Sequence, residues 1–490
     1  MSSGAEPTLY WHDYETWGEN PATDRPAQFA GVRTDENLNI VGEPLMIYAK
    51  PSADLLPKPE ACLITGLVPQ EVATKGVNEA EFVAAIHAEL ARPGTCGVGY
   101  NSIRFDDEVT RYALYRNFYD PYERESRNGN FRWDIIDVVR MTRTLRPEGI
   151  EWPNYENGLP CFKLEILTSA NNLQHEAAHD ALSDVYATIA VAKLIKTKQP
   201  KLYDYAYRLR DKRFVASLID IESAKPLLHI SSKFPNQQGN AALVLPLAHH
   251  PTNKNSVIAY NLGIDPTPLL DLPVEELRLR LFTANDALPE GVERLALKEI
   301  RLNRSPMLVT PAMLDDALAV RLGLDKSRCE QHRKCFTDLS AEGWWALRSK
   351  LASLYSDNDF APKTDPEQQL YAGFFGDQDR RLMARIRKLG STELASTHFE
   401  FEDNRLKDLL FRYRARNFPT SLTVEERQQW QDFCRLRLTD PSWGAGLVLS
   451  EFHSRIHVLL AQYEQDTRAQ EVLKKLMAYA DTLSREHQLL

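Results

Sequence analysis

The sequence lacks most of the features that mark secreted and membrane proteins. Its 490 residues include only six cysteines, none in a CxxC pair, which argues against a disulfide framework and predicts reduced thiols. No apolar stretch approaches the roughly 18 residues of a membrane span. The first residues, MSSGAEPTLYW, have no basic segment followed by an apolar one, and no repeat or low-complexity tract follows. We therefore expect a cytoplasmic globular protein with no membrane association.

Basic residues are fewer than acidic ones. The chain has 59 Lys and Arg against 68 Asp and Glu, which gives a net charge of −9 at pH 7. This balance argues against a surface that is basic overall, although it is compatible with a local basic channel. The length exceeds one ordinary core and predicts about two to four domains.

Secondary-structure patterns divide the chain into three parts. Strand-like segments at residues 9–50, followed by helices and one more strand, predict a mixed-sheet α/β domain over residues 1–199. Residues 200–353 are predicted to form a small, largely β domain, and residues 354–490 a helical domain. The elements expected in the first domain after residue 50 are helices at 79–91, 102–118, 134–146 and 179–196 and a strand at 95–101.

The segment WHDYETWG, residues 11–18, places Asp13 and Glu15 near the end of an apolar strand. Because strand side chains alternate faces, these two carboxylates share one face and Tyr14 points to the other. Two like charges side by side repel each other and are costly to desolvate. By itself the pair fits a solvated strand face as well as a functional site.

Two further acidic segments stand where elements meet, FDDE at 105–108 and HDALSD at 179–184. Strand ends and helix starts converge on one rim of an α/β sheet, so Asp106 and Asp184 can join the first pair there. Four clustered carboxylates need a counter-charge, and hard oxygen ligands select Mg²⁺ or Mn²⁺. Two such ions stabilise the attacking and leaving oxygens of phosphodiester hydrolysis.

His179 precedes Asp184 by five residues, a spacing that does not place both on one helical face. We therefore expect His179 on the loop before the helix, over the site, with the helix starting at Asp180 or a neighbour. A histidine there is suited to deprotonating the attacking water, because histidine titrates near neutral pH.

The order D-x-E, then Asp, then H-x4-D resembles the DEDDh family of 3′→5′ exonucleases, which have a ribonuclease-H-like fold. The resemblance to the bacterial exodeoxyribonuclease I branch covers nearly the whole chain. It implies an SH3-like middle domain, a helical C-terminal domain, and Mg²⁺-dependent 3′→5′ degradation of single-stranded DNA to 5′-mononucleotides in DNA repair and recombination. The segments that carry it are HDYETWG, RPAQFAGVRTD, YNSIRFDDEVTR, FYDPY, RWDIIDVVR, LRPEGI, AHDALSDVYATIA and LFRYRARNFP.

The resemblance also implies a role for each motif residue. His179 would be the general base, and the metal ligands would be Asp13, Glu15, Asp106 and Asp184. The related DEDDy group has Tyr four residues before the last Asp; here that position is Asp180, which places the chain with the His group. In the family a basic residue of the segment FKLEIL binds the terminal nucleotide. This sequence has Lys163 there in place of the expected Arg, which keeps the charge but loses the two-pronged contact.

Arginines recur every three residues at Arg140, Arg143 and Arg146, as either a solvated basic stripe or a track for phosphates. Arg111 and Tyr122 would extend a track, since single-strand binding needs phosphate contacts and aromatic platforms. The residues predicted to contact the substrate are Glu15, Thr16, Lys163, Arg111, Tyr122 and Arg140. The arginine-rich segment LFRYRARNFP, residues 410–419, fits equally a core helix and a wall that faces DNA or a partner.

Partners and rival functions complete the expectations. The resemblance implies contact with the acidic tail of single-stranded DNA-binding protein, and a three-domain chain that encloses its own channel would work as a monomer. An exoribonuclease and a non-catalytic single-strand binder stay as alternatives; a binder gains nothing from a negative cluster that faces phosphates. The segment HEAAH at 175–179 matches the zinc metalloprotease motif, but no Glu or His follows before Glu222, which indicates a chance match.

Overall fold

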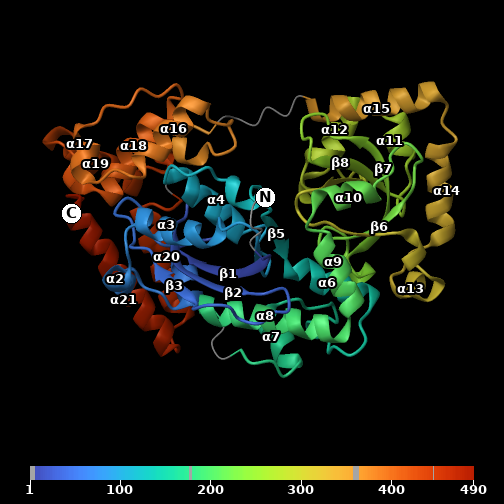
Figure 1. The fold of residues 1–490 in the computed structure, drawn as a ribbon, viewed down its shortest axis with the longest axis horizontal. Helices are drawn as coiled ribbons and strands as arrows, with labels where there is room; N and C mark the ends of the chain where they lie inside the picture. The colour runs from blue at the N-terminus through green and yellow to red at the C-terminus, as the bar shows by residue number, and fades with distance from the viewer. Residues whose placement is uncertain (1–5, 176–178, 357–362, 445, 490) are drawn as a thin grey trace. The chain divides into compact units, whose positions relative to one another are not determined.

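The computed structural model describes residues 6–175, 179–356, 363–444 and 446–489 (Figure 1). The chain divides into two compact units. The first comprises Met1–Phe131, His175–Ile189 and Ala361–Leu490, and the second comprises Arg132–Gln174 and Ala190–Phe360. No helix within the described residues is long and apolar enough to cross a membrane.

A mixed sheet has the strand order β3-β2-β1-β4-β5; β1 to β4 lie in the first unit, which also contains Phe131, the first residue of β5. Strand β1 pairs antiparallel with β2 and parallel with β4, so the predicted mixed α/β architecture is confirmed. The side chains of β2 are buried along its whole length, as expected for a central strand. The strands are β1 (Thr8–Thr16), β2 (Pro26–Thr34), β3 (Leu45–Tyr48), β4 (Thr95–Gly99) and β5 (Phe131–Asp134).

Two helices cover one face of this sheet. Phe82 and Ile86 of α3 and Val109 of α4 pack against Tyr14 and Phe29 of the strands. The cluster holds β1 rigidly, which matters because β1 carries the first acidic pair. The helices of this part are α1 (Pro59–Thr65), α2 (Pro69–Lys75), α3 (Glu79–Leu90), α4 (Asp106–Arg116) and α5 (Glu123–Ser126).

Two boundaries differ from the sequence prediction. The third strand covers only Leu45–Tyr48, because the segment before it forms a single bridge at Ile40 and then a loop. The helix expected from residue 102 begins at Asp106. Asn101 has a φ of +64°, a left-handed conformation that breaks a helix, and the carbonyl of Ser102 accepts bonds from two later amides.

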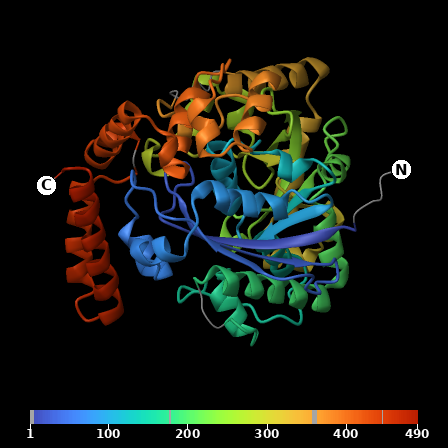
Figure 2. The same cartoon turned by 60° about the vertical axis from the view of Figure 1, so that its left-hand side comes forward.

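The C-terminal helices belong to the same compact unit as the first sheet. Helices α20 and α21 run beside α1 and α2 (Figures 1 and 2) and bury Phe452 and Leu473 against Cys62 and Val72. Apolar burial of this kind is the main force that joins elements far apart in sequence. The helices are α16 (Asp377–Ile386), α17 (Ser391–Ser396), α18 (Arg405–Asn417), α19 (Val424–Thr439), α20 (Leu449–Gln462) and α21 (Thr467–Glu486).

A second sheet, with strand order β10-β6-β7-β8-β9, forms the centre of the second unit and is antiparallel throughout. Its strands are β6 (Leu227–Ile230), β7 (Ala241–His249), β8 (Ser256–Asn261), β9 (Leu297–Arg301) and β10 (Met307–Val309). The predicted β character is therefore present.

Helices in this unit are more extensive than the sequence patterns indicated. Helix α14 was missed because its sequence, KSRCEQHRKCFT, has few apolar residues to set a period. The helices are α6 (Ile135–Leu145), α7 (Leu164–Ala170), α9 (Pro200–Arg208), α10 (Lys212–Leu218), α11 (Thr267–Asp271), α12 (Val274–Phe282), α13 (Asp316–Arg321), α14 (Lys326–Thr337) and α15 (Ala341–Ser356). Helix α8 (Ala181–Lys198) begins in the first unit and ends in the second.

Candidate active site

The end of β1 presents the first two carboxylates. Tyr14 lies in the apolar cluster beneath the sheet, and its hydroxyl accepts a 3.0 Å hydrogen bond from Thr110 of α4. Asp13 is partly buried, and Glu15 is 8% exposed. The alternation of β1 therefore places the tyrosine in the core and the two acids on the opposite face, as the sequence predicted.

Helix α4 brings the third carboxylate to β1. Asp106 is its first residue, and the backbone N–H of Tyr14 donates to Asp106 Oδ1 over 3.1 Å. The adjacent Asp107 forms a buried ion pair with Arg124, which donates to its Oδ1 over 2.6 Å. This pairing distinguishes the two acids of the FDDE segment and leaves Asp106 as the one beside Asp13.

The loop before α8 and its first turn supply the remaining groups. Helix α8 starts at Ala181, so His179 lies on the preceding loop, as expected. The backbone N–H of His179 donates to Asp184 Oδ2 over 3.2 Å, and His175 Nε2 lies 2.6 Å from Asp184 Oδ1. His179 has a φ of +66°, a left-handed conformation that is uncommon outside glycine and recurs at functional sites.

The electrostatics of this cluster are those of carboxylates that repel one another. Burial raises the pKa of Glu15 to about 9, with further contributions from the charges of Asp184 and Asp106. Burial and the charge of Asp106 also raise the pKa of Asp13 well above its usual range. The pKa of Asp184 is raised by burial, and the hydrogen bond with His175 opposes that shift. Such a cluster is stable at neutral pH only with added protons or a cation.

The donor set fits a divalent cation. One ligand atom each from Glu15, His179 and Asp184 lie within 4.8 Å of one another. Asp13 and Asp106 add carboxylate charge next to this group. Carboxylate oxygens dominate the set, which is the preference of hard cations such as Mg²⁺ and Mn²⁺.

The structure argues against a zinc metalloprotease site at His175 and His179, because neither histidine lies on a helix. A zinc site of that type needs both histidines of HEAAH on one helix, whereas α8 begins at Ala181, after His175 and His179. Glu176 lies outside the described residues. His175 instead contacts Asp184, a residue of the competing motif.

Four of the six predicted substrate contacts lie in the first unit: Glu15 of the cluster, Thr16, Arg111 and Tyr122. Thr16 is partly buried, and its hydroxyl donates to the carbonyl of Gly18 over 2.6 Å. The Arg111 guanidinium bonds to both oxygens of Glu125 and lies 5.2 Å from the centre of the Tyr122 ring. These bonds give Arg111 a structural role, while its contact with DNA stays a prediction.

Two predicted contacts lie in the second unit. Lys163 precedes α7 with an exposed side chain whose Nζ is 4.0 Å from Glu165. Arg140 of α6 donates to Asp137 over 2.7 Å and stacks on Phe162 at 5.5 Å. The geometry leaves Lys163 the more available cation of the two.

The sequence of the arginine-rich segment at 410–419 fits both a core helix and a wall that faces DNA or a partner. Arg412 is buried on α18 and bonds to the carboxylate of Asp365, and the Arg416 side chain, 8% exposed, bonds to that of Asp54. Arg414 bonds to Glu426 over 2.7 Å. The structure therefore favours the core interpretation.

Sequence reasoning missed two residues of the site. It treated His175 only as part of a chance zinc motif, although two histidines four residues apart beside the last acid were a usable signal. Asp180 served to exclude a tyrosine and to mark the start of the helix, yet its charge also contributes to the raised pKa values of Asp13 and Glu15. Gln28 donates to Asp180 over 3.4 Å.

The chain matches a family described as exonuclease over residues 10–192, an exonuclease I SH3-like domain over 210–357, and an exonuclease I C-terminal domain over 364–483. Exodeoxyribonuclease I of Escherichia coli (strain K12) is 43% identical over 477 residues, which cover 97% of this chain and 98% of the relative.

Solved structures resemble the chain over almost its full length. A moderately thermophilic exonuclease I from Methylocaldum szegediense has a TM-score of 0.93 at 49% identity, covering 97% of this chain and 99% of that one. E. coli exonuclease I in complex with a dA16 oligonucleotide has a TM-score of 0.93 at 43% identity, covering 98% and 100%. A zinc ion bound form of the E. coli complex with single-stranded DNA has a TM-score of 0.92 at 44% identity, with the same coverage.

Proposed function

The chain belongs to the exodeoxyribonuclease I family, and we propose that its carboxylate cluster holds the divalent metal on which hydrolysis depends. It is an exonuclease that degrades single-stranded DNA from the 3′ end. The observation that carries the proposed site is the convergence of Glu15, His179 and Asp184 within 4.8 Å. The proposed ligands are Asp13, Glu15, Asp106 and Asp184.

In this proposal the site holds two Mg²⁺ ions, which Mn²⁺ can replace. When bound, divalent metal supplies the positive charge that the cluster lacks and stabilises the attacking and leaving oxygens. The chain's own contribution is to hold the ligands in place: β1 fixes Asp13 and Glu15, and the Tyr14 N–H orients Asp106. Burial and the neighbouring charges raise the pKa of Glu15, and a bound cation would favour its charged form.

His179 acts as general base in this proposal. His179 is an exposed loop residue, and a nitrogen of its ring lies within 4.8 Å of carboxylate oxygens of Glu15 and Asp184. The ring can therefore reach the cluster from the solvent side. It would take a proton from the attacking water, and the products are 5′-mononucleotides. The left-handed backbone at His179, fixed by its N–H bond to Asp184, holds the loop in position for this step.

The remaining parts of the proposal concern substrate and setting. Glu15, Thr16, Lys163, Arg111, Tyr122 and Arg140 contact the strand. The enzyme acts as a monomer in DNA repair and binds single-stranded DNA-binding protein. It works in the cytoplasm, and its six free cysteines, five of them buried, suit a reducing compartment. The domain boundaries are 1–199, 200–353 and 354–490.

The test is a time course on single-stranded DNA labelled at its 5′ or 3′ end, with and without Mg²⁺, for the wild type and Asp184→Asn. We expect early release of the 3′ label as mononucleotide, dependence on the metal, and a loss of at least about 100-fold in Asp184→Asn, since residues behind metal ligands already cost up to this much. Asp316→Asn is the matched control, because Asp316 is exposed and outside the cluster. Wild-type turnover in Asp184→Asn would refute the site, and faster digestion of a matched RNA would refute the preference for DNA.

A further inference from the structure

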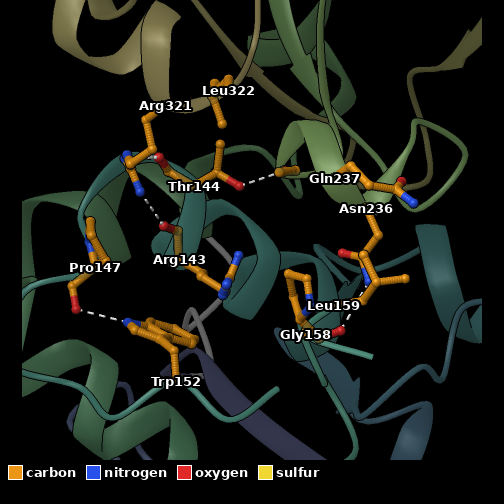
Figure 3. A pocket seen from close by; sticks show the side chains of 12 residues that line it. Arg143, Thr144, Pro147, Trp152, Gly158, Leu159, Asn236, Gln237, Arg321 and Leu322 are labelled. Atoms are coloured by element: carbon orange, nitrogen blue, oxygen red, sulfur yellow. Dashed lines mark hydrogen bonds between the residues drawn. The ribbon is translucent and has the colours of Figure 1, made fainter. Parts of the chain in front are cut away.

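The second unit contains a pocket of about 320 Å³ that the proposed catalytic site does not use (Figure 3). The end of α6, the loop after it, a short helical turn at Asn236–Gln238 and the end of α13 form its walls. All its lining residues lie in this one unit. Its volume is at the lower end of the range for small-molecule sites, about 300–1,000 Å³.

The pocket gathers two positive charges without a negative one. Arg143 and Arg321 both line it, and none of the 12 lining residues is acidic. Within the described residues neither guanidinium has a carboxylate within ion-pair distance. Arg321 donates to the backbone carbonyls of Arg143 and Thr144, which brings the two cations together on the last turn of α6.

Arg143 has unused hydrogen-bonding capacity. Among the described residues its Nε is buried without a hydrogen-bond partner, and the guanidinium makes one long bond of 3.4 Å, from Nη2 to Asn154. Burial and the charge of Arg321 lower the pKa of Arg143, the reverse of what a partnered guanidinium shows. Both effects are relieved by an anion, and phosphate is one of the anions whose oxygens match the guanidinium donors.

The rest of the lining suits a flat ring with polar edges. Trp152 lines the floor, and its indole N–H is fixed to the carbonyl of Pro147 over 2.8 Å (Figure 3). Leu159 and Leu322 add apolar surface. The Oδ1 of Asn236 is buried and has no hydrogen-bond partner in the part of the chain that the structure describes, while its Nδ2 donates to Pro160, so one acceptor is left for a ligand.

We propose that this pocket binds one nucleotide, with its phosphate on Arg143, its base against Trp152, and the base edge within reach of Asn236. The combination indicates the class: an anion alone does not need the indole, and an uncharged ring does not need Arg143 and Arg321. The nucleotide comes either from a bound strand or from released mononucleotide. Only its deoxyribose form rests on the proposed function, because the pocket is independent of the carboxylate cluster.

The first experiment measures binding of 5′-dTMP, thymidine and inorganic phosphate to the full chain by calorimetry in excess EDTA. We expect Arg143→Gln to weaken 5′-dTMP at least about 10-fold, as for a lost charge-assisted bond, with thymidine unchanged. Gln237→Glu, at an exposed lining residue, should weaken 5′-dTMP similarly through charge repulsion without perturbing the fold. Arg213→Gln is the control, since Arg213 is an exposed arginine of the same unit.

Photo-cross-linking with 5-iodo-2′-deoxyuridine 5′-monophosphate separates this pocket from the carboxylate cluster. Peptides from residues 143–160 or 236–239 should carry the label and lose it in Gln237→Glu. Labels confined to peptides of the cluster, or unchanged affinity in both variants, would overturn the proposal. Inorganic phosphate or an oligo-aspartate peptide binding as tightly as 5′-dTMP would also overturn it.

The source of the nucleotide follows from oligothymidylate binding by the same variants. A strand nucleotide predicts that Arg143→Gln weakens the oligonucleotide and 5′-dTMP alike. A product site predicts that only 5′-dTMP is weakened. Either result supports the pocket. If Asp184→Asn digests DNA at the wild-type rate while Arg143→Gln still binds 5′-dTMP more weakly, the proposed catalytic site is refuted and the nucleotide pocket is supported.

Discussion

The Nε2 of His175 lies 2.6 Å from Oδ1 of Asp184, and the histidine side chain is only 6% exposed. The other oxygen of Asp184 accepts the backbone N–H of His179. Both carboxylate oxygens are thus fixed before any cation binds, and pre-orientation by groups behind a ligand is what sets metal affinity. This makes His175 a positioning residue.

His175→Ala should therefore weaken divalent metal binding and lower kcat by about 10- to 100-fold, with little change in KM for DNA. Mn²⁺ affinity measured by calorimetry reads the effect without turnover. His175→Gln, which retains a donor toward Asp184, should recover part of the metal affinity, and His457→Ala, at an exposed residue of α20, should change nothing. Unaltered Mn²⁺ affinity in His175→Ala would rule out the positioning role.

The metal-free protein should lose stability as pH rises from about 5 to about 9. Glu15 has a folded pKa of about 9, whereas an unfolded Glu titrates near about 4.3. Between these values the folded state binds more protons than the unfolded state, so the free energy of unfolding falls with pH, by up to about 1.4 kcal/mol per unit for each such group.

Urea unfolding in EDTA across this pH range measures the slope. Adding Mg²⁺ should flatten it, because the cation replaces the protons that the cluster otherwise needs. Glu15→Gln should flatten it without metal. A metal-free stability that rises steadily to pH 9 would contradict the assignment.

The features that sequence could predict are the local ones. Period-2 alternation in β1 placed Asp13 and Glu15 opposite Tyr14, and the structure puts Tyr14 in the core. The spacing of His179 and Asp184 placed the histidine before its helix, and α8 starts at Ala181. These inferences needed only backbone geometry, so no distant residue could overturn them.

Features that depend on distant partners could not be predicted. Arg416 bonds to Asp54, 362 residues away, and nothing in the segment LFRYRARNFP identifies that carboxylate. Likewise, Arg111 follows FDDE and resembles a phosphate contact, whereas Glu125 already occupies its guanidinium. A local pattern specifies the type of charge, but tertiary packing decides its partner.

Removing Glu367 should destabilise the first unit strongly. Burial alone would raise the pKa of its carboxyl group. Arg25, Arg416 and two further arginines instead hold that pKa well below its usual range. Glu367→Gln leaves these buried guanidiniums short of a negative charge and should lower the free energy of unfolding by about 3–5 kcal/mol.

Chemical denaturation measures this loss. Glu71→Gln is the matched control, because its ion pair with Lys475 is exposed and should cost about 0–1 kcal/mol. A loss as small as the control's would mean that the buried network contributes little to stability.

Gly99 should tolerate no larger side chain, because two parts of the site meet there. A Cβ at Gly99 would lie 2.9 Å from the backbone oxygen of His12, next to Asp13, and 2.7 Å from Cβ of Ser102. The Ser102 carbonyl anchors the turn that leads into Asp106. Gly99→Ala should therefore cost about 1–3 kcal/mol of stability and lower kcat by displacing both acids. Gly343→Ala, on α15, is the control with a clash only against a movable Leu339 side chain. Thermal unfolding and turnover of the two variants measure the difference, and equal behaviour would show that β1 and the α4 turn adjust freely.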